Sequence, residues 1–231
     1  MREIVLDTET TGLDPLDGHR LVEIGCIELV NRIPSGQTFH AYFNPQRSMP
    51  AEAFAVHGLS DDFLKDKLFF AEVAEDLVAF LGDAPLVIHN AAFDVGFINA
   101  ELERAGRPLI PRERTVDTLL IARRKHPGAS NRLDDLCVRY AIDNSRRTKH
   151  GALLDAELLA EVYVELIGAR QAQLVLSQTT MPRRLTGEPI IVRERLLPLV
   201  AAVTAEERAA HRAFIATLGD NAIWRDYVSS D

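Results

Sequence analysis

The order of the apolar segments along the chain constrains its fold more than any other feature. Strand-like apolar runs come first, at residues 2–6, 21–30 and 37–43, with turn residues at 34–36 before the third run. A helical period follows at 69–81, ended by Gly82. Beyond it lie a short strand at 85–89 and helical segments at 95–104, 116–124, 132–140 and 153–167. Strands followed by alternating strand and helix predict an α/β fold with a mixed sheet flanked by helices.

The character of the sequence changes after Arg170. Residues 171–195 are polar, lack periodicity and contain Pro and Gly, which is typical of a flexible linker. Residues 196–231 are apolar again, with a helix-start signal at Thr204, but they are too few to form a core alone. We therefore expect a domain at 1–170, a linker at 171–195 and a short helical C-terminal segment at 196–231.

Composition narrows the class of protein. About half of the residues are apolar and a quarter are charged, as in soluble globular proteins, and no apolar stretch approaches the roughly 20 residues that span a bilayer. Residues 2–6 form a strand-like run and not a signal peptide. Cys26 and Cys137 lie far apart in apolar surroundings, so we expect buried thiols in a reducing compartment. These features predict a cytoplasmic protein with no membrane partner.

The net charge of −8 argues against a protein that grips nucleic acid unaided, because phosphate contacts usually bring a basic excess. The charge fits two other cases. One is an enzyme whose carboxylates hold cations, and the other is a subunit that a partner delivers to its substrate.

Four carboxylates and one histidine lie at the ends of the expected elements. Asp7 and Glu9 follow the first strand, Asp94 lies near a helix start, and Asp155 is in the first turn of the long helix, just after His150. Each motif alone is explained as well by an acidic turn or a helix-capping carboxylate. Together they indicate oxygen ligands for hard cations such as Mg²⁺ or Mn²⁺. Two such ions, roughly 3.5–4 Å apart, can promote attack on a phosphodiester, with a histidine as general base.

Several motifs resemble one enzyme family. They are Asp-Thr-Glu-Thr-Thr-Gly-Leu at 7–13, Val-His-Gly-Leu at 56–59, His-Asn-Ala-Ala-Phe-Asp at 89–94, Asp-Asn-Ser-Arg-Arg-Thr at 143–148 and His-Gly-Ala-Leu-Leu-Asp-Ala-Glu at 150–157. This set resembles the DEDDh branch of the DEDD 3′→5′ exonucleases, and within it the epsilon, or proofreading, subunits of bacterial DNA polymerase III. The resemblance covers about residues 1–170 and implies a ribonuclease H-like fold.

The resemblance also implies a role for each matching position. Asp7, Glu9, Asp94 and Asp155 would hold two divalent cations, and His150 would deprotonate the attacking water. The residues expected to contact the 3′ end of single-stranded DNA are Thr10, Thr11, Gly12, Leu13, Val56, His57, Asn90 and Phe93. For Phe93, plain core packing is an open alternative. Asp117 would be a further acidic position of the family, either contacting the metal ligands from behind or having a structural role.

The C-terminal region suggests partners. Gln171, Leu174 and Leu176 resemble the short peptide by which replication proteins dock on the sliding clamp, although they also fit a last helical turn. The apolar residues of 196–231, with Phe214 and Trp224 as anchors, suit a segment that folds against another protein. In the resembled family that partner is the polymerase alpha subunit.

Two other functions fit parts of the sequence. A different DEDDh exonuclease would act on RNA ends or short oligonucleotides, but it would not need the linker and the apolar tail. A catalytically silent binding module would have lost a metal carboxylate or His150, and all five positions are present.

Overall fold

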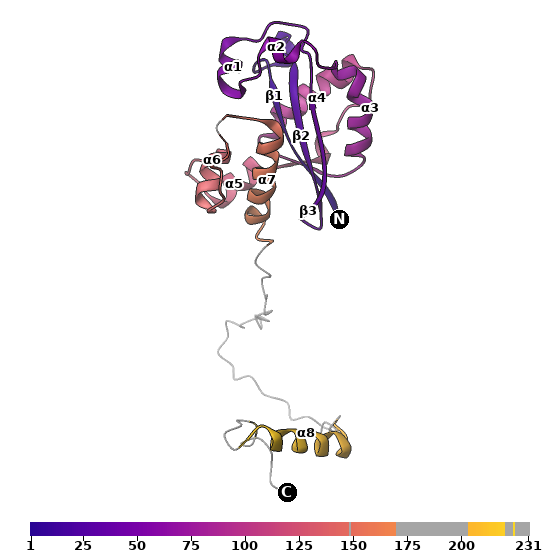
Figure 1. The fold of residues 1–231 in the computed structure, drawn as a ribbon, viewed down its shortest axis with the longest axis vertical. Helices are drawn as coiled ribbons and strands as arrows, with labels where there is room; N and C mark the ends of the chain where they lie inside the picture. The colour runs from indigo at the N-terminus through magenta and orange to yellow at the C-terminus, as the bar shows by residue number, and fades with distance from the viewer. Residues whose placement is uncertain (148, 170–202, 220–223, 225–231) are drawn as a thin grey trace, which may run out of the picture. The chain divides into compact units, whose positions relative to one another are not determined.

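A computed structural model describes residues 1–147, 149–169, 203–219 and 224 (Figure 1). The chain divides into two compact units, residues 1–174 and 175–231. Three residues of the expected clamp peptide, Gln171, Leu174 and Leu176, lie outside the described ranges.

The first unit is built on a five-stranded mixed sheet with the order β3-β2-β1-β4-β5. The first three strands are antiparallel neighbours, and β4 and β5 extend the sheet in parallel with β1. The strands are β1 (Arg2–Thr10), β2 (Leu21–Val30), β3 (Ile33–Tyr42), β4 (Leu86–Ile88) and β5 (Thr115–Asp117). The mixed sheet and its flanking helices confirm the predicted ribonuclease H-like fold.

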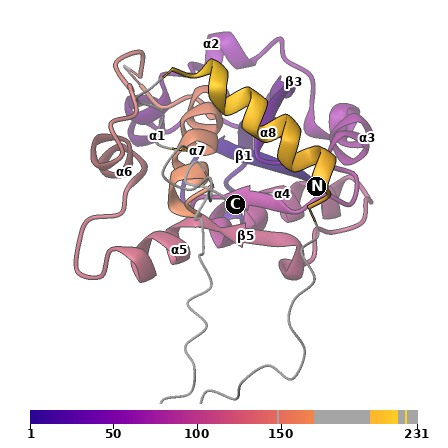
Figure 2. The same cartoon turned by 90° about the horizontal axis from the view of Figure 1, so that it is seen from below.

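Helices cover both faces of the sheet, as Figures 1 and 2 show. Two of them, α3 (Phe70–Leu81) and α4 (Ala91–Arg104), pack on one face. On the other face lie α5 (Thr118–Lys125), α6 (Leu133–Arg139) and α7 (Ala152–Leu166). The remaining short elements are η1 (Pro15–Asp17), α1 (Ala51–His57), α2 (Asp61–Leu64) and η2 (Arg112–Arg114).

Alternation along β1 joins the two halves of the core. Ile4 and Leu6 are fully buried against the α3 and α4 side, whereas Val5 is fully buried against the α5 to α7 side. Successive side chains of a strand point to opposite faces, so this short apolar run contributes to both layers. Cys26 and Cys137 are buried free thiols, as predicted.

The structure corrects the predicted hairpin between β2 and β3. Its turn is Asn31-Arg32, where both residues have positive φ, of 52° and 67°, as the favoured two-residue hairpin turn requires. Pro34, Ser35 and Gly36, predicted as the turn, belong to β3 instead. Proline is tolerated there because β3 is an edge strand whose free side needs no amide donor.

Other elements differ at their boundaries. Strand β1 continues to Thr10, four residues beyond the prediction, because it pairs with β2 along that whole length. The predicted helix at 116–124 is in fact a short parallel strand, β5, followed by α5, which starts at Thr118. Helix α4 begins at Ala91 instead of 95, and α1 and α2 occupy a segment for which no element was predicted.

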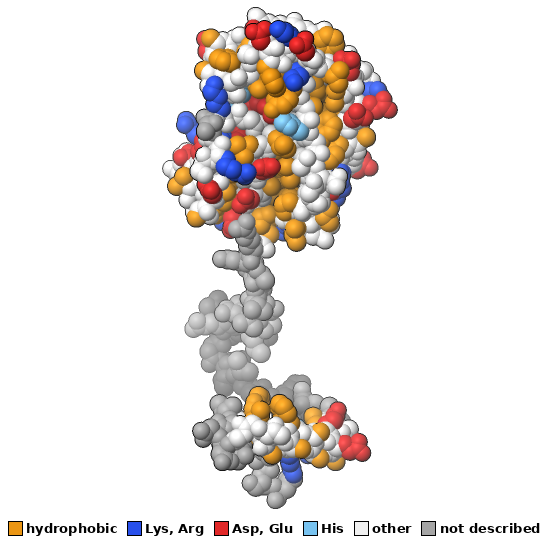
Figure 3. Space-filling view, in the orientation of Figure 1, with side chains coloured by type: hydrophobic (Ala, Val, Ile, Leu, Met, Phe, Trp, Pro, Cys, Tyr) orange, Lys and Arg blue, Asp and Glu red, His pale blue; other side chains and the backbone are white. Residues whose placement is uncertain are grey.

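In the second unit, the described residues form α8 (Ala205–Thr217) with Trp224 beyond it. The helix-start signal is confirmed, since Thr204 and Glu207 form a capping box. Hydrophobic side chains run along α8 and acidic ones gather at one end (Figure 3). Phe214 and Trp224 are 60% and 54% exposed, so both aromatic rings are accessible. Across the described ranges, no helix combines the length and the apolar character needed to cross a membrane.

Candidate active site

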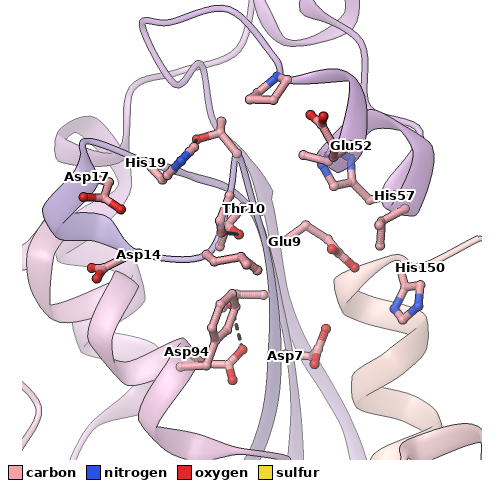
Figure 4. Close-up of a pocket in the computed structure, with 18 of the residues that line it drawn as sticks. Asp7, Glu9, Thr10, Asp14, Asp17, His19, Glu52, His57, Asp94 and His150 are labelled. Carbon is pink, nitrogen blue, oxygen red and sulfur yellow. Dashed lines mark hydrogen bonds between the residues drawn. The ribbon is translucent and has the colours of Figure 1, made fainter.

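Two cavities of the first unit contain all five predicted catalytic positions. A cavity of about 630 Å³ opens where β1 ends and is lined by Asp7, Glu9, Asp94 and His150 (Figure 4). A second cavity of about 180 Å³ shares Asp7 and His150 with it and adds Asp155. The sequence motifs, up to 148 positions apart, are therefore brought together by the fold.

Strand β1 sends its polar side chains to both faces. Asp7 and Glu9, two residues apart, share the face on which α7 packs. Thr8 points the other way, and its hydroxyl donates a hydrogen bond of 2.7 Å to Oδ1 of Asp94, in the first turn of α4. This bond fixes one oxygen of Asp94 beside the strand.

Gly25 allows α7 to approach the sheet closely. It lies on β2 directly opposite Asp7, and a Cβ atom there would come within 2.3 Å of the backbone of Leu153. Any side chain at this position would push the start of α7 away, together with Asp155. A glycine inside an apolar strand signals such an approach, although no role was predicted for Gly25.

Arg147 links Asp155 to His150. Its Nε and one terminal nitrogen donate to the two oxygens of Asp155, at 2.5 Å and 2.7 Å. The same terminal nitrogen lies 2.6 Å from Nδ1 of His150. The arginine belongs to a motif noted in the sequence, but its contacts depend on tertiary structure and it had no predicted role.

Three of the four carboxylates, Asp7, Glu9 and Asp94, resist ionisation. Loss of solvent, followed by repulsion from Asp94 and Glu9, raises the pKa of Asp7 well above its usual value. Burial and the charge of Asp155 raise the pKa of Glu9 to about 8, and burial raises that of Asp94 to about 7. For Asp155, burial acts in the same direction, but hydrogen bonds from His150 and Arg147 outweigh it and hold the pKa below its usual value.

These residues fit divalent cations. Carboxylate oxygens are the ligands that hard cations prefer, and the pKa values of three of them are raised by burial first and by neighbouring carboxylates second, both of which a bound cation would offset. Glu9, His150 and Asp155 each offer one ligand atom, and these atoms lie within 4.8 Å of one another. His150 is thus placed to serve either as a base or as a ligand.

Seven of the eight predicted substrate-contacting residues line the larger cavity: Thr10, Thr11, Gly12, Leu13, Val56, His57 and Phe93. The ring centroids of Phe93 and Phe97 are 5.1 Å apart, so Phe93 lines the cavity and also packs against the hydrophobic core. Asn90 is not among the lining residues. It is an exposed residue with a φ of 72° at the start of α4, and Asp117 accepts a hydrogen bond from its backbone amide.

Asp117 and His89 have structural contacts. Asp117 caps α5 by accepting hydrogen bonds from the amides of Leu119 and Leu120. Both ring nitrogens of His89 are 2.9 Å from a partner, the Thr118 hydroxyl and the Asn131 carbonyl. The cavity wall also includes residues with no predicted role, namely Asp14, Asp17, His19, Pro50, Glu52 and Ala53.

Comparisons with known proteins agree with this geometry. The exonuclease family model matches residues 4–163. DNA polymerase III subunit epsilon of Rickettsia conorii is 46% identical, over 94% of this chain and 96% of its own length. The subunit of the same name from Escherichia coli K12 is 45% identical, over 97% of both chains.

Solved structures show the same fold at low sequence identity. The nuclease domain of 3′hExo, described as a DEDDh family member bound to rAMP, has a TM-score of 0.60 at 16% identity. The likeness covers 73% of this chain and 92% of that one. From the family match and the high identity to its relatives, we conclude that the chain belongs to the exonuclease family, among the DNA polymerase III epsilon subunits, and is a 3′→5′ exonuclease.

Proposed function

We propose that this exonuclease removes nucleotides from the 3′ end of single-stranded DNA, releasing nucleoside 5′-monophosphates, and that it proofreads for a replicative polymerase. One observation carries the proposal: four carboxylates and His150 line two cavities beside β1, of about 630 Å³ and about 180 Å³, that share Asp7 and His150. The family relationship supports a DNA substrate, because the relatives are named as subunits of a DNA polymerase.

In this proposal Asp7, Glu9, Asp94 and Asp155 hold two divalent cations, Mg²⁺ or Mn²⁺. Bound ions of this kind help to activate a water and stabilise the leaving oxygen. Glu9, Asp94 and Asp155 are each less than 8% exposed, so their charges act where water screens them little. Thr8 keeps Asp94 oriented through its 2.7 Å hydrogen bond.

His150 accepts the proton of the attacking water. It lies just before α7 with its side chain 46% exposed, so a water molecule can reach the ring from the cavity. An imidazole is suited to this step because it changes charge near neutral pH. The 3.2 Å contact between its Nδ1 and Asp155 keeps the ring beside the carboxylates.

The wall of the larger cavity receives the terminal nucleotide. The turn at 10–13 is held by its own hydroxyls, since Thr10 donates to the Gly12 carbonyl at 2.6 Å and Thr11 accepts from the Arg20 amide at 2.9 Å. Leu13 and Val56 remain exposed and offer apolar contact to a sugar or base. Phe93 offers a ring for stacking.

A substrate comparison tests the proposed activity. In Mg²⁺ the full chain should shorten single-stranded DNA from its 3′ end, and EDTA should stop the reaction because it removes the cations. An RNA strand of the same sequence should be degraded more slowly. Preference for RNA, or undiminished activity in EDTA, would contradict the proposal.

We further propose the division 1–170 for catalysis, 171–195 as a linker with a clamp-binding peptide, and 196–231 for polymerase binding. The alpha subunit of DNA polymerase III is the proposed partner of the last segment. Exposed Phe214 and Trp224 support this, because exposed aromatic residues often anchor interfaces. The net charge of −8 is consistent with DNA being held by partner proteins.

Replacing Trp224 by alanine should weaken binding to the polymerase alpha subunit by about 2 kcal/mol if the ring is an interface hot spot. Exonuclease activity of the isolated chain should stay unchanged, because Trp224 lies outside the catalytic unit. Calorimetric binding and DNA degradation are measured in parallel. Leu109→Ala is the matched control, since Leu109 is a comparably exposed apolar residue, at 52%, of the first unit.

A fragment ending at Arg170 separates two roles of the tail. If the tail only binds a partner, the fragment should fold and degrade DNA like the full chain. If the tail braces the nuclease unit, truncation should lower melting temperature and activity together, which would contradict the proposed division.

A further inference from the structure

We propose that Arg147 is an internal counterion of the site when no metal is bound. Its guanidinium pairs with Asp155 and contacts His150 until divalent cations displace the guanidinium toward Asp134. The inference rests on the proposed function, because it takes Asp155 as a cation ligand. It adds a residue that sets how readily the site accepts its cations.

The contacts of Arg147 use the groups that the cations and the reaction need. Its planar fork binds both oxygens of Asp155, at 2.5 Å and 2.7 Å, in the bidentate geometry that arginine makes with carboxylates. Its side chain is only 7% exposed and that of Asp155 only 2%, so the pair is largely shielded from solvent. A cation that binds Asp155 would share these oxygens with the guanidinium, and the two positive charges would repel each other at close range.

His150 is held in the same way. A terminal nitrogen of the Arg147 guanidinium lies 2.6 Å from Nδ1 and 3.4 Å from Nε2 of His150, so the cationic group lies directly against the ring. In this arrangement the guanidinium, and not a water molecule, contacts Nδ1. Withdrawal of Arg147 would free Asp155, the proposed cation ligand, and His150, the proposed base, at the same time.

Asp134 gives Arg147 a second attachment. The other terminal nitrogen of the guanidinium lies 2.6 Å from Oδ2 of Asp134, whose side chain is 53% exposed. Asn144 donates to the other oxygen of Asp134 at 3.1 Å and steadies it. The guanidinium can therefore leave Asp155 without losing every ionic partner.

Charge balance explains why a cationic side chain is present. Asp7, Glu9, Asp94 and Asp155 repel one another in a site that excludes much solvent. Arg147 offsets this repulsion, and its charge lowers the pKa of both Asp7 and Glu9 against the larger effect of burial. Bound divalent cations would supply more positive charge and would repel the guanidinium.

Titration of the full chain with Mn²⁺ alone, without DNA, tests the inference. Arg147→Gln should bind Mn²⁺ at least about fivefold more tightly than wild type, the low end of usual coupling between two binding events. Its melting temperature without metal should fall, and saturating Mn²⁺ should restore most of the loss. Arg146→Gln is the matched control with the same charge change, because Arg146 is 71% exposed and pairs with Glu157 only at 3.7 Å.

Equal or weaker Mn²⁺ binding by Arg147→Gln would overturn the inference and make Arg147 an orienting partner of Asp155. If that variant does not fold, Arg147→Lys keeps the charge but cannot form the fork, and it should bind Mn²⁺ more tightly than wild type by a smaller factor. Equal or weaker binding by Arg147→Lys would then overturn it. Failure of the proposed function looks different: wild type would bind no Mn²⁺, or Asp155→Asn would bind it as wild type does.

Discussion

An Asp7→Asn chain should degrade single-stranded DNA at least about a thousandfold more slowly than wild type in saturating Mg²⁺. Asparagine keeps the size of the side chain but removes the charge that a cation requires. Cations in such sites supply several kcal/mol of transition-state stabilisation, and about 4 kcal/mol corresponds to a factor of a thousand. Initial rates on a 3′-labelled strand measure the effect, and Asp155→Ala should behave alike.

The fold of Asp7→Asn should survive. Asp7 faces Asp94, Glu9 and Asp155, so removing its charge relieves repulsion in the metal-free protein. Asp83→Asn, at an exposed loop before β4, is the control for a charge change elsewhere. Activity of Asp7→Asn close to wild type, with Asp83→Asn also active, would contradict the assignment of Asp7 to a metal site.

The pH dependence of stability provides a second readout of the same substitution. Glu9 and Asp94 have pKa values of about 8 and about 7 in the folded protein, above the ordinary range near 4 of an unfolded carboxyl. Between about pH 4 and about pH 8, the folded state therefore holds more protons on these two carboxyl groups than the unfolded state does. Metal-free wild type should therefore lose stability as pH rises from about 4 to about 8, and Asp7→Asn should lose less.

Replacing His150 by alanine should lower the turnover number by roughly 10²–10⁴-fold, the usual contribution of a positioned base. In the proposed mechanism His150 moves a proton and does not hold a cation, so affinity for Mn²⁺ should change little. Kinetics and Mn²⁺ titration on the same preparation separate the two roles. His211→Ala, an exposed histidine on α8, is the control and should leave nuclease activity intact.

The structure makes this test informative, because ligand atoms of His150, Glu9 and Asp155 lie within 4.8 Å of one another. If Mn²⁺ affinity collapsed together with turnover, His150 would be a ligand and the proposed base would be wrong.

Many elements of the fold could be predicted from local sequence. Strand β1, helices α3 and α7 and the capping box of α8 follow from periodicity and end signals that lie within each element. The convergence of Asp7, Asp94 and Asp155 could also be predicted, because each lies near the end of a core strand or at the start of a helix that packs on the sheet.

Other features depend on tertiary contacts that local patterns do not carry. Pro34 suggests a turn at 34–36, but the chain turns at 31–32 instead, where Asn31 and Arg32 both adopt positive φ. Strand β5 has only three residues and is stabilised by its pairing with β4. The contacts of Arg147 with Asp134 and Asp155 join separate helices, so no spacing along the chain reveals them.

Counting the Mn²⁺ ions bound by the full chain at equilibrium tests most directly whether the carboxylate cluster holds two cations. Wild type should bind two ions per chain, and Asp7→Asn should lose at least one of them together with exonuclease activity. Two ions bound with unchanged affinity by Asp7→Asn would show that this carboxylate cluster does not hold the catalytic cations.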